Sequence, residues 1–199
     1  ATLLVTVFLI IGATFSDYGV SWDDEFSRYQ GADFLRWYAT GFRDKLVLSH
    51  AVNEYIYGAA FHVPAAFVAF ISPLRPYESI HLLIALTGLL GLFLTYQVAR
   101  VLGGSRAGFL ATLILVLTPS YYGHSFINPK DIPFAVAYLG TLLCLLTLYS
   151  QLPKPGYRRI ALTGAALGLA LGIRVGGVML FGYVALLIVI WHTAEHVKR

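Results

Sequence analysis

Long apolar blocks separated by short polar turns make up most of this sequence. The apolar blocks occupy residues 1–15, 80–98, 107–122, 132–149, 160–172 and 175–191. A helix needs about 20 apolar residues to cross the hydrocarbon core of a bilayer, and several blocks reach that length. The apolar residues are continuous and do not follow the spacing of an amphipathic surface helix. The pattern therefore predicts an all-α fold, a polytopic transmembrane helix bundle of about six spans.

The longest polar stretch, residues 16–54, follows the first block. It carries seven acidic and four basic residues, a net charge of −3. Residues 55–71 are apolar but contain His62 and Pro64, so we expect a helix that lies at the membrane interface, with a kinked span as the alternative. Residues 16–79 are thus predicted to form a long outer loop with interfacial helices, and residues 80–199 to contain the remaining spans of one transmembrane domain.

The turns between the later blocks set the expected orientation. A glycine-rich break at residues 172–177 separates two blocks that would otherwise form one helix much longer than a bilayer requires. Lys and Arg in short loops mark the cytoplasmic side. Six spans place the basic loops 100–106 and 151–159 on that side, together with the tail that carries Lys198 and Arg199. The opposite, outer side then receives the acidic segment 16–54, the turn 128–131 and Arg174.

Composition supports a membrane protein. Hydrophobic residues make up 58% of the chain and charged residues 12%, against about 45–50% and about 25% in soluble domains. The net charge of +4 resides between apolar blocks, where it sets topology, so we expect contact with membrane lipid and not with nucleic acid. The chain starts inside an apolar run and ends in a short polar tail, which suggests a fragment of a longer protein.

An acidic cluster, Trp22-Asp23-Asp24-Glu25, lies just outside the first block, and Tyr29 follows four residues after Glu25. Adjacent carboxylates repel each other, so at least one of them needs a cation, a hydrogen-bond donor or a proton. Such a cluster can hold a metal ion or supply a general base. The plainer interpretation is a solvated loop that caps a helix over residues 27–41, with Asp23 or Asp24 as the N-cap.

Three further charged residues are expected on the same outer side. Asp131 precedes an apolar block with a proline in its first turn, which is typical of an N-cap, and Lys130 is suited to anchoring at the interface. Arg174 lies between two apolar blocks and needs a partner or a route to the surface. It either extends to the lipid headgroups or holds a phosphate, which its planar guanidinium suits.

Three motifs in sequence order resemble the N-terminal half of a GT-C glycosyltransferase, in the branch of the protein O-mannosyltransferases and the bacterial aminoarabinose transferases. They are an Asp-Glu pair outside the first span with a tyrosine four residues later, a Lys-Asp-x-Pro turn that opens a later span, and a helix ending in Gly-Ile-Arg-Val-Gly-Gly. The resemblance covers nearly all of the chain. It implies transfer of a sugar from a polyprenyl-phosphate donor to an acceptor at the outer, periplasmic face of a bacterial inner membrane.

The resemblance also implies roles for residues. Asp24 corresponds to the base or acceptor-orienting carboxylate, Glu25 to an assisting acid and Asp131 to the second acidic position of the family. The expected substrate-binding residues are Asp23, Tyr29, Lys130 and Arg174. From their charge, and not from the resemblance, we expect Lys130 and Arg174 to neutralise the donor phosphate.

Metal use varies within the superfamily, so a divalent ion is left open. Family members are typically longer, with more spans than this chain. The alternative function is therefore a catalytically inactive interaction subunit of a membrane complex. It predicts an apolar helix face buried against partner proteins and no open groove for a lipid.

Overall fold

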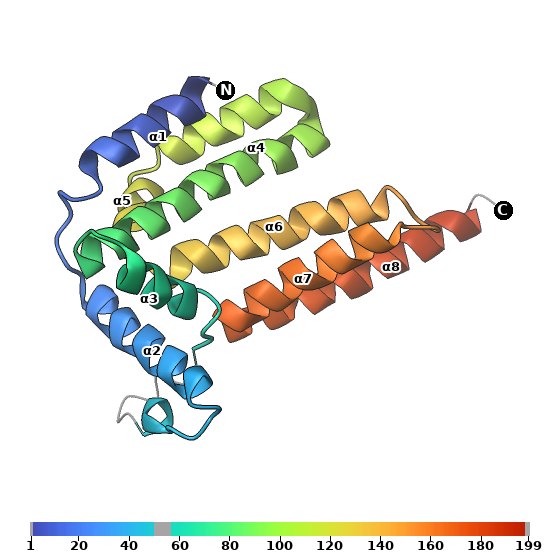
Figure 1. Cartoon of the computed structure of the whole chain (residues 1–199). Coiled ribbons are helices and arrows are strands. Elements are labelled where there is room, and N and C mark those ends of the chain that lie inside the picture. Colours follow the sequence, from blue (N-terminus) through green and yellow to red (C-terminus); the bar gives the residue numbers. More distant parts are fainter. Residues whose placement is uncertain (1, 50–56, 198–199) are drawn as a thin grey trace.

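The computed structural model describes residues 2–49 and 57–197 of the chain. Helix accounts for 81% of the chain, and the described residues contain eight α-helices and no strand. Figure 1 shows the longer helices lying side by side as a bundle, with α2 and α3 gathered at one end. The predicted all-α membrane bundle is confirmed.

The helical elements follow one another with short connections. In chain order they are α1 (Thr2–Thr14), α2 (Trp22–Ala39), the 3₁₀ turn η1 (Leu46–Leu48), α3 (His62–Ile71), α4 (Pro76–Val116), α5 (Pro119–Ile127), α6 (Asp131–Tyr149), α7 (Tyr157–Ile173), the 3₁₀ turn η3 (Val175–Val178) and α8 (Met179–Val197). By length and composition, three stretches of the described chain can cross a membrane: α4, α6 and Val175–His196. The apolar helices α1 and α3 are shorter. At ten residues, α3 is about 15 Å long, half of a hydrocarbon core.

Helix α4 is a hairpin of two arms that run back along each other (Figure 1). Its chain reverses at Gly104, where φ is 80° and ψ is 178°, a region that essentially only glycine adopts. Beyond the turn, the backbone of Gly108 packs tightly on the first arm. A Cβ atom at Gly108 would lie 2.8 Å from the carbonyl oxygen of Tyr96. The reversal falls within the turn predicted at residues 100–106.

The second arm of α4 is shorter than its predicted span, residues 107–122. It ends at Val116, and α5 starts separately at Pro119. Proline suits the first turn of a helix because it has no N–H to leave unpaired, and it disfavours continuation of the preceding helix. The single span predicted here is therefore wrong, and the chain instead forms a short arm and a short helix that leads into the start of α6.

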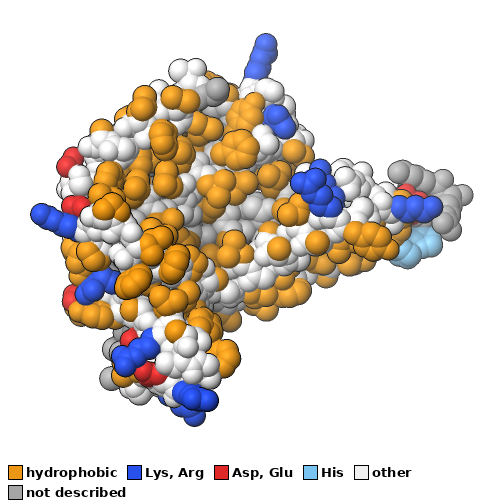
Figure 2. Space-filling view, viewed as in Figure 1, with side chains coloured by type: hydrophobic (Ala, Val, Ile, Leu, Met, Phe, Trp, Pro, Cys, Tyr) orange, Lys and Arg blue, Asp and Glu red, His pale blue; other side chains and the backbone are white. Residues whose placement is uncertain are grey.

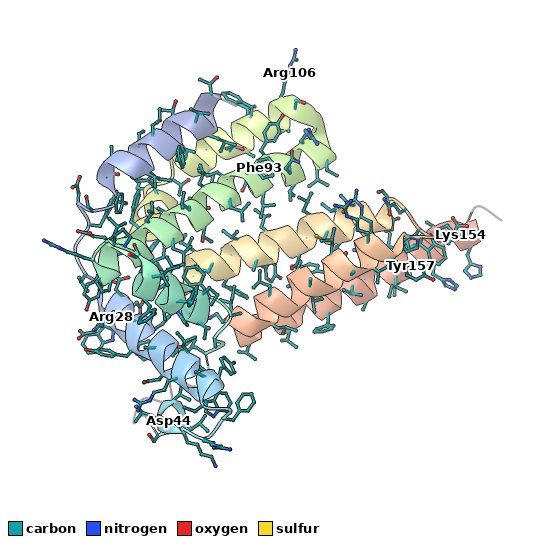
Figure 3. All side chains as sticks on the ribbon, viewed as in Figure 1. Arg28, Asp44, Phe93, Arg106, Lys154 and Tyr157 are labelled. Carbon is teal, nitrogen blue, oxygen red and sulfur yellow. The ribbon has the colours of Figure 1, made fainter. Side chains whose placement is uncertain are left out.

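The two ends of the bundle carry different elements. The α4 turn and the loop between α6 and α7 lie away from α2, α3, the start of α6 and the end of α7 (Figure 1). Figure 3 places Arg106 and Lys154 at ends of the molecule remote from Arg28 and Asp44. Hydrophobic side chains cover most of the face between them in Figure 2. This arrangement agrees with the predicted grouping of loops; Lys198 and Arg199 lie outside the described residues.

Two apolar clusters hold the bundle together, and both use the first arm of α4. One includes Ile84 of α4, Val136 of α6 and Ile173 of α7. The other includes Leu92 of α4, with Phe126 of α5 and residues of α1. Between membrane helices, such side chains stabilise the fold through close van der Waals packing, because the surrounding lipid tails are equally apolar. The first arm of α4 thus fixes α5, α6 and α7 relative to one another.

Helix α2 begins at Trp22, five residues before the predicted start. Its N-cap is Ser21, whose Oγ accepts a hydrogen bond from the Asp24 N–H at 3.2 Å. In return, Asp24 Oδ2 accepts from the Ser21 N–H at 2.8 Å, which completes a capping box. The predicted N-cap role of Asp23 or Asp24 is wrong because the serine before the acids takes that position.

Candidate functional site

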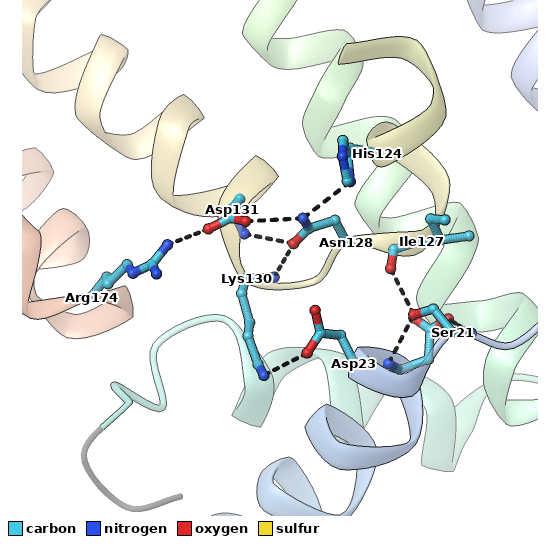
Figure 4. A network of polar contacts seen from close by, with 9 residues as sticks. Ser21, Asp23, His124, Ile127, Asn128, Lys130, Asp131 and Arg174 are labelled. Atoms are coloured by element: carbon cyan, nitrogen blue, oxygen red, sulfur yellow. Dashed lines mark hydrogen bonds and ion pairs between the residues drawn. The ribbon is translucent and has the colours of Figure 1, made fainter. Parts of the chain in front are cut away.

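Two ion pairs lie next to each other at the turn between α5 and α6 (Figure 4). Lys130 Nζ donates to Asp23 Oδ1 of α2 at 2.8 Å. Arg174, in extended backbone conformation after α7, donates through Nη1 to Asp131 Oδ1. Because Lys130 and Asp131 are neighbours in sequence, the turn joins the two pairs. Residues far apart along the chain thereby form one charged cluster.

The turn itself is held by Asn128. Its Oδ1 accepts from the backbone N–H groups of Lys130 at 3.2 Å and Asp131 at 2.8 Å. Its Nδ2 donates to Asp131 Oδ2 at 3.1 Å and lies 3.2 Å from His124 Nδ1. Asn128 therefore satisfies the first N–H groups of α6, so the predicted N-cap role of Asp131 is wrong. The Asp131 carboxylate is instead available to Arg174.

Sequence reasoning missed Asn128 and His124. The signal for Asn128 was present, because an asparagine followed by proline favours the start of a turn, and an asparagine side chain readily bonds the backbone two residues later. No sequence signal identified His124, whose position one helical turn before Asn128 matters only once α5 is known to be a separate helix.

Aromatic rings enclose the Lys130 ammonium group. Its Nζ lies 3.9 Å from the ring centre of Phe26 and 5.1 Å from that of Tyr57, which attracts the cation to the ring faces. Only 16% of the Lys130 side chain is exposed, against 43% of Asp23. Lys130 is thus a fixed cation at the protein surface and not a mobile anchor in the headgroup layer.

Buried His62 at the start of α3 responds to the same charges. Burial lowers its pKa from 6.5 to about 4; the positive charge of Lys130 acts in the same direction, and the negative charge of Asp23 opposes them. His62 is therefore neutral at neutral pH. Its Nδ1 is buried and has no hydrogen-bond partner among the described residues.

The other predicted site residues on α2 do not take part in these two ion pairs. Asp24 is completely buried, and its Oδ2 lies 3.1 Å from Nε2 of buried His81. Glu25 is exposed. Tyr29 is half exposed and has the Arg28 guanidinium 4.4 Å above its ring centre.

Of the seven predicted site residues, the structure joins four by direct contact. These are Asp23, Lys130, Asp131 and Arg174. Within the described residues, no side-chain hydrogen bond or ion pair joins the other three, Asp24, Glu25 and Tyr29, to these four.

An apolar cavity of about 560 Å³ is lined in part by residues close in sequence to Asp131 and Arg174, although neither of these two residues lines it. Its wall includes Phe134, one helical turn after Asp131, and Gly176, two residues after Arg174. From there it extends between α4 and α6, where Gly91, Leu115, Tyr121, Leu139 and Leu142 line it. The Tyr121 hydroxyl donates to the Gly88 carbonyl at 2.7 Å. The cavity therefore suits a hydrocarbon chain.

Within the described residues, no group of three or more His, Cys, Asp or Glu side chains is placed to hold a metal ion. The cluster pairs each carboxylate with a cation. Chemically, the arrangement offers two cations that can bind an anion and two carboxylates that can orient a hydroxyl group or accept its proton.

Comparison with known proteins assigns most of the chain. Residues 51–197 match the family model described as dolichyl-phosphate-mannose-protein mannosyltransferase. No curated protein and no solved structure gave a significant match. The matched stretch contains Lys130, Asp131, Arg174 and the walls of the cavity, while Asp23 and the rest of the acidic cluster precede it. Because the match covers well over half of the sequence and agrees with the GT-C resemblance of its motifs, the chain belongs to the dolichyl-phosphate-mannose-protein mannosyltransferase family.

Proposed function

We propose that this protein transfers a sugar from a polyprenyl-phosphate donor to an acceptor hydroxyl group at the outer face of a bacterial inner membrane. The observation that carries the proposal is the joining of two ion pairs at the start of α6, a helix that also lines an apolar cavity. Family membership supports membrane glycosyl transfer. The basic loops at the opposite end of the bundle support the outer location of the cluster.

The two cations are suited to the donor phosphate. Arg174 presents a planar guanidinium that can bind two phosphate oxygens at once, and Lys130 supplies a compact charge nearby. The lipid tail would then lie in the apolar cavity, where packing against the protein replaces its contacts with neighbouring lipid chains. Donor recognition thus combines charge at one end with burial at the other.

Asp23 is our choice for the general base, in place of Asp24. Its side chain is 43% exposed and contacts Lys130 through Oδ1, while Oδ2 has no partner within the described residues and points toward the turn in Figure 4. Asp131 uses both carboxylate oxygens, for Arg174 and Asn128, and is suited to orienting Arg174. Asp24 has no exposed surface from which to reach an acceptor.

In this reaction the acceptor oxygen bonds to the anomeric carbon while the bond from that carbon to the phosphate oxygen breaks. The acceptor proton passes to Asp23, and the electron pair of the broken bond leaves with the phosphate. Arg174 and Lys130 stabilise the negative charge that develops there. Glu25 and Tyr29 lie outside this step and remain candidates only for contacts with the acceptor.

The test is transfer of radiolabelled sugar from polyprenyl-phosphate donors in membranes that contain the full chain. Replacing Asp23 by Asn should lower kcat by about 10²–10⁴, the usual contribution of a general base. The exposed loop acid Asp17 provides the matched control, and Asp17→Asn should transfer at the wild-type rate. Equal transfer by Asp23→Asn and wild type would remove Asp23 from the chemistry.

The alternative, an inactive interaction subunit, is favoured by the exposure of the last span. Only 11% of the apolar stretch Val175–His196 is buried, so most of its surface is free for lipid or a protein partner. The alternative also predicts no lipid cavity, whereas an apolar cavity is present. The two functions are separated by measuring the binding of a polyprenyl phosphate. If the protein binds it and Ala135→Phe abolishes the binding, the enzyme is favoured over the interaction subunit.

A further inference from the structure

Buried Asp24 and His81 form a contact between α2 and α4. The Asp24 side chain has no exposed surface and that of His81 only 2%, and Asp24 Oδ2 lies 3.1 Å from His81 Nε2. Oδ1 of the same carboxylate is buried without a hydrogen-bond partner in the described structure. Burial of a carboxylate costs free energy that its partners must offset. The position therefore calls for an explanation beyond the start of a helix.

Helix capping alone does not require this burial. At the start of α4, Glu78 accepts a hydrogen bond from the Arg75 N–H at 3.1 Å, as Asp24 does from Ser21. The Glu78 side chain is 24% exposed. The chain thus contains the same kind of cap at the surface, and the additional feature at Asp24 is its link to His81.

Ser21 connects the Asp24–His81 contact to the turn between α5 and α6. While its Oγ accepts from the Asp24 N–H, it also donates to the carbonyl oxygen of Ile127 at 3.0 Å. Ile127 is the last residue of α5 and directly precedes Asn128. Figure 4 shows this bond beside the Asp23–Lys130 pair. A continuous set of contacts therefore runs from α4 through Asp24 and Ser21 to the turn that carries Lys130 and Asp131.

We propose that Asp24 is a positioning residue: with His81 it fixes Ser21 and thereby the α5–α6 turn, so that Lys130 and Asp131 lie opposite Asp23. The inference rests on the proposed function for its catalytic consequence. Asp23 is attached to the same anchor through the backbone, since it is the residue before Asp24. The contact between Asp24 and His81 of α4 therefore positions both Asp23 and Lys130.

The first readout does not depend on activity. A water-soluble carbodiimide joins a carboxylate and an amine in contact into an amide, with loss of the carboxylate oxygen to the carbodiimide as its urea. In the purified full-length protein it should link Asp23 to Lys130, which lie 2.8 Å apart, and mass spectrometry measures the yield. Asp24→Ala should lower the yield at least threefold, whereas Asp24→Asn should retain it, because an amide oxygen in the place of Oδ2 can accept from both the Ser21 N–H and an Nε2–H of His81.

The second readout is transfer, measured below the unfolding temperature of each variant. Asp24→Ala should lower kcat about 10–100-fold, since a displacement near 1 Å can cost about 10²-fold, and Asp24→Asn should recover most of it. Glu78→Ala is the matched control, because it breaks a cap that does not reach the turn; it should keep both the amide yield and kcat.

Two results would overturn the proposal. One is an unchanged amide yield in Asp24→Ala. The other is a loss of transfer in Asp24→Asn as complete as in Asp23→Asn, which would make Asp24 a chemical participant. Absence of transfer by the wild-type protein from every polyprenyl-phosphate donor would refute the proposed function, and the cross-linking yield would still decide the positioning role.

Discussion

The buried histidine at the start of α3 gives the protein a specific sensitivity to acid. Burial, assisted by the charge of Lys130, lowers the pKa of His62 to about 4 in the folded protein, whereas an unfolded chain has a histidine pKa of about 6.5. Below pH 6.5 the unfolded chain takes up a proton at His62 and the folded protein does not. Stability is therefore complete above pH 6.5 and is lost as the pH falls through 6.5 toward 4.

The magnitude follows from the two pKa values. Each unit of difference corresponds to about 1.4 kcal/mol, so about 2–3 kcal/mol of unfolding free energy should be lost between pH 7 and pH 4.5 through His62 alone. His62→Gln keeps a neutral polar side chain and cannot titrate. The variant should lose about 2–3 kcal/mol less than the wild-type protein over this range, although its stability at pH 7 will be lower where packing is disturbed.

The assay is denaturant unfolding of the purified protein in detergent at pH 7 and pH 4.5, which gives a change in free energy for each variant. His192, exposed on α8, provides the control, and His192→Gln should follow the wild-type protein at both pH values. Carboxylates also titrate in this range, but they do so in every variant and cancel in the comparison. An equal decrease in unfolding free energy between pH 7 and pH 4.5 in the wild-type protein and in His62→Gln would refute the reasoning.

Two further predictions concern the cavity and the α4 turn. Ala135→Phe places a ring in the apolar cavity and excludes part of the donor tail from it, so the donor KM for long-chain donors should rise about tenfold, a loss of about 1.4 kcal/mol. Ala161→Phe on the exposed surface of α7 should leave this KM unchanged. Gly104→Ala forces alanine to φ 80° and should lower the unfolding free energy by about 1–3 kcal/mol. Gly164→Ala, where a Cβ meets nothing within 4 Å, should not lower it; equal effects would contradict the strain at the turn.

The lengths of the apolar blocks and the charges of the loops predicted an all-helical membrane bundle with its basic loops grouped together. Apolar length identified the helices, and glycine positions identified two of the reversals, at Gly104 and around Arg174. The boundaries failed where a local residue competed with the apolar pattern. Pro119 divides an apolar stretch that hydropathy alone treats as one span, and Ser21 starts α2 before the acids that seemed suited to cap it.

The sequence predicted which charged residues lie on the same side of the membrane, but not which of them are in contact. That argument brought Asp23, Lys130, Asp131 and Arg174 to one end of the bundle, where the structure joins them in pairs. It had no means to separate Asp23 from Asp24, because consecutive residues on a helix point about 100° apart and the rotation of α2 depends on its packing. Three-dimensional packing against His81 decides which acid is buried.

The pairing of every charge in the cluster has a consequence for selectivity. Arg174 and Lys130 each already have a carboxylate partner, so a small anion from solution must compete with groups that are held in place and gains little by entering. A phosphate that carries a long isoprenoid chain is held in the bilayer by that chain, which raises its effective concentration beside the cluster. Under the proposed function, free sugar phosphates in water are therefore expected to compete poorly with a donor anchored in the membrane.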